Sequence, residues 1–131
     1  MHLVDSSSWI HSLRPEGDGD VRARVESLVR TGNACWCPLV KLELWNGARK
    51  EHEKRVLRDM EGRLEELEIT PDVWNLACDL ARKAREKGIK VPATDLLIAA
   101  CARHYRVELE HCDDHFEALE KITIGPADNH G

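Results

Sequence analysis

The segment "VPATDLLIAACA", residues 91–102, predicts the most apolar helix of the chain. From Leu96 onward its residues are all apolar, and Asp95 is the single charge. A helix that is apolar on nearly every side belongs inside a domain. Burying a carboxylate costs several kcal/mol unless it is paired or bound to a cation. Asp95 therefore either complements the dipole of a helix start that Thr94 caps, or belongs to a larger acidic site.

Strands and helices alternate on both sides of this segment. The spacing of apolar residues predicts strands over residues 2–5, 34–40 and 106–112, and helices over 21–30, 41–67, 71–88, 94–104 and 114–122. Two further short segments, residues 68–70 and 123–125, are possible strands. Alternation of this kind favours a parallel sheet covered on both sides, so the predicted fold is α/β, a three-layer α/β/α sandwich. We expect one domain over residues 1–125 and a loose tail over 126–131.

Composition and charge narrow the function classes. The chain has 131 residues, 42% hydrophobic and 33% charged, which is typical of one globular domain. No apolar run approaches the roughly 20 residues of a membrane span, and the first ten residues lack the pattern of a signal peptide. Five cysteines without a CxxC pair indicate reduced and mostly buried thiols, so we expect a cytoplasmic protein. A net charge of −5 argues against nucleic-acid binding by bulk charge, but not against a nuclease whose site needs acids.

Acidic residues stand where the predicted elements would meet. Asp5 ends the first strand, Asp113 follows the last, and Glu43 and Asp95 fall in the first turns of helices. Ligands of open parallel sheets collect beyond the carboxyl ends of the strands. Each acid alone has an ordinary role in a turn or cap, but several carboxylates together repel and favour a bound cation. Oxygen ligands suit Mg²⁺ or Mn²⁺, which can activate water against a phosphodiester.

Four motifs carry a resemblance to a known family. They are "LVDSSSWI" (3–10), "LELWNGA" (42–48), "TDLLIAACA" (94–102) and "CDDHFEAL" (112–119). In this order they resemble the PIN-domain nucleases, and most of all the VapC-type ribonuclease toxins, over residues 2–125. The resemblance implies a PIN-like fold and a metal-dependent endoribonuclease. By position it implies that Asp5, Glu43, Asp95 and Asp113 hold one or two Mg²⁺ or Mn²⁺ ions. The resemblance assigns Asp113 and not Asp114, because the family's last acid stands three residues before the phenylalanine, here Phe116.

The resemblance also implies partners and helper residues. It implies cleavage of structured RNA, often tRNA, a homodimer, and a small VapB-like antitoxin whose tail crosses the acidic cleft. Ser7 matches the hydroxyl residue that follows the first acid. His111 departs from the family, which usually has threonine or serine there, so it either takes over a role facing water or phosphate or shifts activity. Candidates for RNA phosphate contacts are Arg14, Lys41 and Arg49.

Three alternatives compete with this interpretation. A zinc site in "HCDDH" (111–115) is disfavoured because alternation along a strand would send His111 and Cys112 to opposite faces. A receiver-type phosphoacceptor domain would need a second acid beside Asp5, where serines stand. An inert PIN-like binding module would be expected to have lost one or more of the acids. The four tryptophans indicate core packing or a dimer surface.

Overall fold

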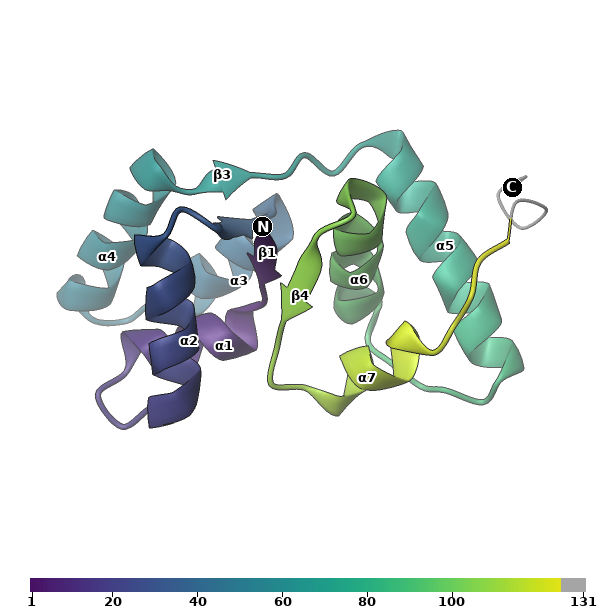
Figure 1. Cartoon of the computed structure of the whole chain (residues 1–131), viewed down its shortest axis with the longest axis horizontal. Helices are drawn as coiled ribbons and strands as arrows, with labels where there is room; N and C mark the ends of the chain where they lie inside the picture. The colour runs from purple at the N-terminus through teal and green to yellow at the C-terminus, as the bar shows by residue number, and fades with distance from the viewer. Residues whose placement is uncertain (126–131) are drawn as a thin grey trace.

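Four short strands and seven helices alternate along residues 1–125, which are the residues that the computed structural model describes (Figure 1). The elements are β1 (His2–Val4), α1 (Ser6–Leu13), α2 (Gly19–Arg30), β2 (Ala34–Trp36), α3 (Pro38–Gly47), α4 (Glu51–Arg63), β3 (Glu65–Glu66), α5 (Pro71–Glu86), α6 (Ala93–Tyr105), β4 (Glu108–Glu110) and α7 (Asp114–Glu120). The predicted loose tail, residues 126–131, lies outside the described residues. Among the described helices, none has the length and apolar character needed to cross a membrane.

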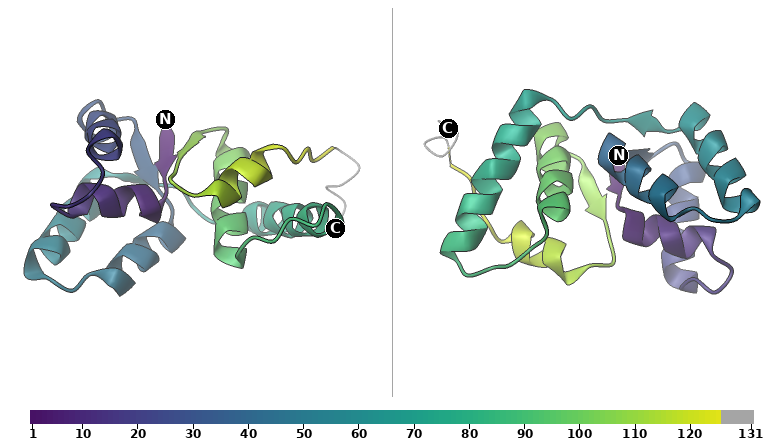
Figure 2. Two further views of the ribbon diagram at one scale, coloured as in Figure 1. Left: turned by 90° about the horizontal axis from the view of Figure 1, so that it is seen from below. Right: turned by 180° about the vertical axis from the view of Figure 1, so that it is seen from behind.

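The strands form one parallel sheet in the order β3-β2-β1-β4. Leu3 of β1 lies opposite Cys35 of β2 on one side and Leu109 of β4 on the other. Helices cover both faces: in the left view of Figure 2, α2 lies on one side of the strands and α3 and α4 lie on the other. The predicted three-layer α/β/α arrangement is confirmed.

The core is densest at the central strands and along α6. Leu3 and Val4 of β1 and Cys35 and Trp36 of β2 are fully buried, as expected for parallel strands covered on both faces. In α6, the six residues 97–102 are all buried. The apolar stripe of α5 packs along α6, so the long helical pair encloses this half of the core (Figures 1 and 2).

Several predicted boundaries are wrong for identifiable reasons. The second strand stops at Trp36 because Pro38 occupies the first turn of α3, where its missing N–H costs nothing. The last strand spans residues 108–110 rather than 106–112, because Arg106 is left-handed (φ 56°) and ends α6. The third strand lies at residues 65–66 rather than 68–70, and residues 123–125 form no strand.

The strand order creates a switch point between β1 and β4. The chain moves outward from β1 through β2 to β3, and then returns to place β4 on the opposite side of β1. The backbone N–H of Asp5 donates to the carbonyl oxygen of Glu110 at 2.9 Å, so the carboxyl ends of β1 and β4 are adjacent. In open α/β sheets, ligands bind at such a point. The strand order therefore predicts a ligand site at the carboxyl ends of β1 and β4.

Candidate active site

Asp5 begins the site at the end of β1. Its carboxylate caps α1 by accepting hydrogen bonds from the Ser7 N–H at 3.2 Å and the Ser7 hydroxyl at 2.7 Å. The residue is only 4% exposed. A cap of this kind satisfies N–H groups that a helix start otherwise leaves without partners. Asp5 therefore has a fixed carboxylate direction as well as a structural role.

The serine run after Asp5 connects the other segments of the site. The Ser6 hydroxyl donates to Oε1 of Glu43 at 3.3 Å. The Ser7 hydroxyl accepts from the backbone N–H of Cys112 at 3.2 Å while donating to Asp5. The three predicted site residues Asp5, Ser7 and Glu43 therefore share one hydrogen-bonded region. Ser6 was not predicted, because a serine after a strand signals only a turn.

Ser8 forms a hydrogen bond with Glu110, the acidic residue at the end of β4. Its buried hydroxyl donates to Oε2 of Glu110 at 3.3 Å. Arg24 of α2 lies 2.7 Å from the other Glu110 oxygen, and the Glu110 side chain is 11% exposed. This paired acid fixes α2 to the switch point.

Glu43 lies in the second turn of α3 rather than the predicted first, since α3 begins at Pro38. Burial raises the pKa of the Glu43 carboxyl, and the negative charges of Asp5 and Asp95 raise it further. The hydrogen bond from Ser6 opposes this rise. The three acids are thus close enough to disfavour one another's ionised forms.

Asp95 enters the site from the first turn of α6, as predicted. The predicted cap is wrong: Pro92, not Thr94, is the N-cap, and no side chain bonds there. Burial raises the pKa of the Asp95 carboxyl; the hydrogen bond from His115 opposes this, while the charges of Asp113 and Asp5 add to it. Its side chain is 14% exposed. A carboxylate in this environment favours a cation nearby.

Asp113 and His115 complete the cluster at the start of α7. Asp113 is the N-cap of α7 and accepts from the His115 N–H at 2.9 Å. The His115 Nδ1 atom lies 3.0 Å from Oδ2 of Asp95 and 3.0 Å from Oδ1 of Asp113. One potential ligand atom from each of these three residues lies within 4.8 Å of the others. The cluster in the structure therefore contains an imidazole nitrogen in addition to the carboxylate oxygens that the sequence predicted.

The donor set fits a divalent cation. Of the four predicted acids, Asp95 and Asp113 place ligand atoms within 4.8 Å of each other and of His115. Asp5 and Glu43 lie near enough for their charges to interact with this group: Asp5 raises the pKa values of the Glu43 and Asp95 carboxyls, and Asp95 raises that of Glu43. Carboxylates with raised pKa values are held at an electrostatic cost that a cation would remove. Carboxylate oxygens are ligands for Mg²⁺ and Mn²⁺, and imidazole is a ligand for transition metals.

Residues 2–122 match the family model described as PIN domain. The chain belongs to the PIN-domain family. The ribonuclease VapC21 of Mycobacterium tuberculosis is 32% identical over 132 residues, which cover 97% of this chain and 91% of that protein.

Solved structures agree on the fold of this PIN domain. The crystal structure of FitAcB from Neisseria gonorrhoeae is 23% identical, with a TM-score of 0.75, over 97% of this chain and 99% of that one. VapBC-5 from M. tuberculosis, described as a member of a toxin–antitoxin family, is 22% identical, with a TM-score of 0.70, over 93% and 92%.

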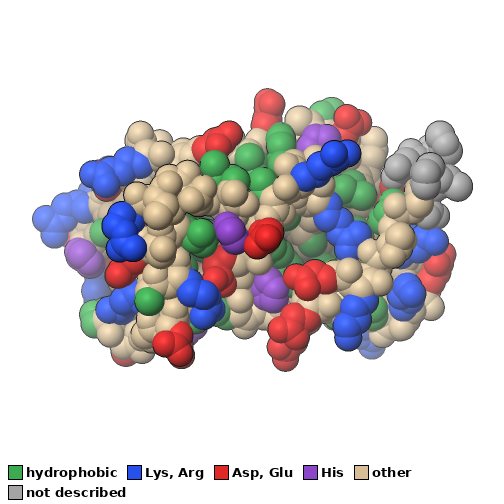
Figure 3. Space-filling model, in the orientation of Figure 1, with side chains coloured by type: hydrophobic (Ala, Val, Ile, Leu, Met, Phe, Trp, Pro, Cys, Tyr) green, Lys and Arg blue, Asp and Glu red, His purple; other side chains and the backbone are tan. Residues whose placement is uncertain are grey.

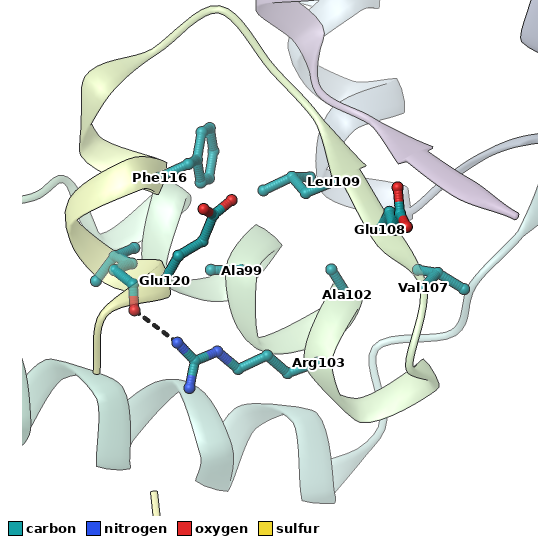
Figure 4. A pocket seen from close by; sticks show the side chains of 9 residues that line it. Ala99, Ala102, Arg103, Val107, Glu108, Leu109, Phe116 and Glu120 are labelled. Atoms are coloured by element: carbon teal, nitrogen blue, oxygen red, sulfur yellow. Dashed lines mark hydrogen bonds between the residues drawn. The ribbon is translucent and has the colours of Figure 1, made fainter. Parts of the chain in front are cut away.

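The last helix of the PIN domain is held against α6 at both ends. At its start, His115 contacts Asp95. At its end, the Arg103 guanidinium of α6 donates to the carbonyl oxygens of Leu119 at 2.6 Å and Ile122 at 2.8 Å. Figure 4 shows Arg103 reaching across a cavity of about 310 Å³ between α6, β4 and α7, whose lining includes none of the four acids. Arg103 therefore positions the end of α7 against α6.

His111 packs within its own segment of the PIN domain. Its ring lies 5.1 Å from that of Phe116, centroid to centroid, and Nε2 lies 3.6 Å from Oε1 of Glu120. Its Nδ1 accepts from the Asp113 N–H at 3.4 Å. The strand ends at Glu110, so the alternation argument for His111 and Cys112 does not apply. The contacts indicate a positioning role for His111; a direct role in catalysis stays a prediction.

The three basic candidates have different surroundings. Arg14 is exposed and lines a small hollow that also contains Glu43. The Lys41 ammonium pairs with Glu66 of β3 at 2.8 Å. Arg49 is exposed in the connection between α3 and α4. Figure 3 shows acidic side chains and a histidine gathered over the start of α7, with basic side chains on both sides.

Proposed function

We propose that this PIN domain is a metal-dependent endoribonuclease and the toxin of a toxin–antitoxin pair. The observation that carries the proposal is the meeting of four acids from distant parts of the chain at the switch point of the sheet. The VapC ribonuclease relatives and VapBC structural neighbours support it. A bound Mg²⁺ or Mn²⁺ would polarise the phosphate and neutralise charge that develops on its oxygens.

The chain's own residues have distinct roles in this proposal. Asp95 and Asp113 would hold the ion, with Asp5 oriented toward it by Ser7. Glu43 is suited to accept the proton of the attacking water, because burial and neighbouring charges raise the pKa of its carboxyl. Ser6 occupies Oε1 of Glu43, which leaves Oε2 for that proton.

RNA is the substrate in this proposal, and tRNA is the class that we expect first. Arg14 is the best placed of the basic candidates, because it lines the same hollow as Glu43. Lys41 would have to leave Glu66 before it contacted a phosphate. The net charge of −5 favours recognition of a shaped RNA over binding by bulk charge.

The proposed protein partner is a VapB-like antitoxin that covers the acidic site, in the cytoplasm. An apolar groove of about 460 Å³ between α1, α2 and α4 offers such a partner a second surface. Its apolar lining consists of Trp9, Leu13, Val29, Val56, Met60 and Leu64. A groove of this chemistry fits the apolar face of a helix.

A homodimer is also proposed. Leu42 on α3 and Trp74 on α5 are large apolar side chains that are 63% and 54% exposed. Burial against a second copy would remove this apolar surface from water. Sedimentation of the wild type and of Trp74→Glu would test this part: the wild type should sediment as a dimer and the variant as a monomer.

The first experiment is cleavage of total RNA by purified wild type and Asp95→Asn in Mg²⁺, Mn²⁺ or EDTA. Asp72→Asn is the matched control, because Asp72 also lies in the first turn of a helix but is exposed on α5. We expect discrete fragments from the wild type and the control, and none from Asp95→Asn or in EDTA. A folded wild type that cuts nothing with either ion would favour the inert binding module instead.

A further inference from the structure

We propose that the His115 imidazole is a direct ligand of the ion and makes the site prefer Mn²⁺ over Mg²⁺. This inference rests on the proposed metal-dependent function and specifies the donor set at that site. It concerns a residue that the motif-by-motif resemblance did not assign.

The positions of the donor atoms support direct ligation. Octahedral Mg²⁺ has metal–oxygen distances of about 2.1 Å, so two adjacent ligand atoms lie about 3.0 Å apart. The His115 Nδ1 lies 3.0 Å from Oδ2 of Asp95 and 3.0 Å from Oδ1 of Asp113. These distances match the spacing of neighbouring ligands of a single ion. They also match the hydrogen bond between His115 and Asp95 described above, so a bound ion would replace that hydrogen bond.

The backbone holds His115 in this orientation. The His115 N–H donates to the Asp113 carboxylate that caps α7, so the cap and the imidazole are parts of the same turn. The far end of α7 is bound by Arg103 of α6, the helix that also carries Asp95. The imidazole is therefore positioned against Asp95 by contacts at both ends of α7, which reduces the ordering that ion binding must impose.

The neighbouring histidine has a different environment. The ring nitrogens of His111 face Glu120 and the Asp113 N–H, and its side chain is 12% exposed. The side chain of His115 is 42% exposed and directs Nδ1 toward two acids. Of these two histidines, His115 alone presents a nitrogen to the carboxylate pair.

The chemistry of the nitrogen predicts the preference. Imidazole is a better ligand for transition metals than for Mg²⁺, whose sites are built from oxygen. Replacing one oxygen ligand by nitrogen should therefore favour Mn²⁺ relative to Mg²⁺. An all-oxygen site would lack this bias.

The test measures ion binding directly, without RNA cleavage. Pulsed electron paramagnetic resonance of Mn²⁺-loaded protein detects the magnetic coupling of a directly bound nitrogen. Mg²⁺ competition then gives the ratio of Mn²⁺ to Mg²⁺ affinity. The variants are His115→Asn, which offers an oxygen near the position of Nδ1, and His115→Ala. His104→Gln is the control, since His104 is an exposed histidine of α6.

We expect nitrogen coupling in the wild type and in His104→Gln, and its loss in both His115 variants. The Mn²⁺ to Mg²⁺ affinity ratio should fall by about tenfold in His115→Asn. Mn²⁺ binding without nitrogen coupling, or an unchanged ratio, would overturn the role of His115. In that case EDTA-sensitive cleavage of RNA would leave the proposed function standing. A wild type that binds neither ion would overturn both.

Discussion

Burial has opposite energetic effects in the α5–α6 pair and at the acidic edge of the sheet. Along α5 and α6, burial removes apolar side chains from water: Leu80 and Ile98 are fully buried. At the edge, burial raises the pKa values of the Glu43 and Asp95 carboxyls and so disfavours their ionised forms. Helix α6 belongs to both regions, because its apolar body anchors the acid at its first turn. Stability generated in one region thus supports an arrangement of charges that is unfavourable by itself.

The largest expected effect is a loss of stability in the helical pair. Leu80→Ala should lower the free energy of unfolding by about 3 kcal/mol, because it leaves a cavity among fully buried neighbours. Chemical denaturation followed by circular dichroism would measure it, with Asn75→Ala on the exposed side of α5 as the control. A loss as small as that of Asn75→Ala would mean that this pair does not anchor the fold.

A smaller effect of opposite sign is expected at the acidic edge. Glu43→Gln should raise the free energy of unfolding of the metal-free protein by less than about 1 kcal/mol, because solvent screens this partly exposed carboxyl, while abolishing RNA cleavage. The reason is that the folded protein disfavours the ionised Glu43, whose pKa is raised by burial and by Asp5. Denaturation in EDTA would measure it, with the exposed Glu61→Gln as control. A destabilised Glu43→Gln would contradict the view that this edge is held at a cost.

The third expected effect is a pH dependence of that difference. A carboxyl whose pKa is raised by folding contributes stability below its ordinary pKa, and this contribution is lost as the pH rises through the raised value. For Glu43 the ordinary value is 4.5. The stability advantage of Glu43→Gln over wild type should therefore be small below that pH and grow toward neutrality. Denaturation of both proteins in EDTA across this range would show it, and a constant difference would exclude the proposed cause.

The smallest expected effect is at a surface ion pair of α4, which belongs to neither of the two regions compared above. Arg63 and Asp59 of α4 are 3.4 Å apart, with side chains 71% and 59% exposed. Arg63→Ala should change the free energy of unfolding by less than about 0.5 kcal/mol, because solvent screens such pairs. The same denaturation assay applies. A larger decrease in the free energy of unfolding would show that this surface ion pair contributes to stability in spite of its exposure to solvent.

Much of the fold follows from patterns that act over short stretches. The apolar run over residues 96–102 predicts the buried helix α6. The acids at the strand ends predict which edge of the sheet carries the site. The two-residue strand β3 escaped prediction, because Glu65 and Glu66 are exposed and have no apolar alternation. The predicted strand over residues 34–40 runs past Pro38, although this proline begins helix α3.

The sequence predicts the acids of the candidate site but not the contacts that connect them. The four acids are recognisable because they occupy motifs near strand ends and helix starts. Ser6 gave no such signal, since a serine in a turn is common, and His115 was part only of the disfavoured zinc motif over residues 111–115. Their contacts join residues 37 and 20 positions apart in sequence. Spacing cannot reveal such pairs unless the strand order and the helix orientations are known.

The sequence by itself determined the alternation of strands and helices, the burial of α6 and the family of the chain, because local hydrophobic patterns and motifs carry these properties. The tertiary structure alone decided that β4 returns beside β1 and brings Asp113 and His115 to Asp95. It also decided which carboxyls are buried enough to have raised pKa values. Distance and desolvation depend on how all the elements pack together, and no local stretch of sequence contains them.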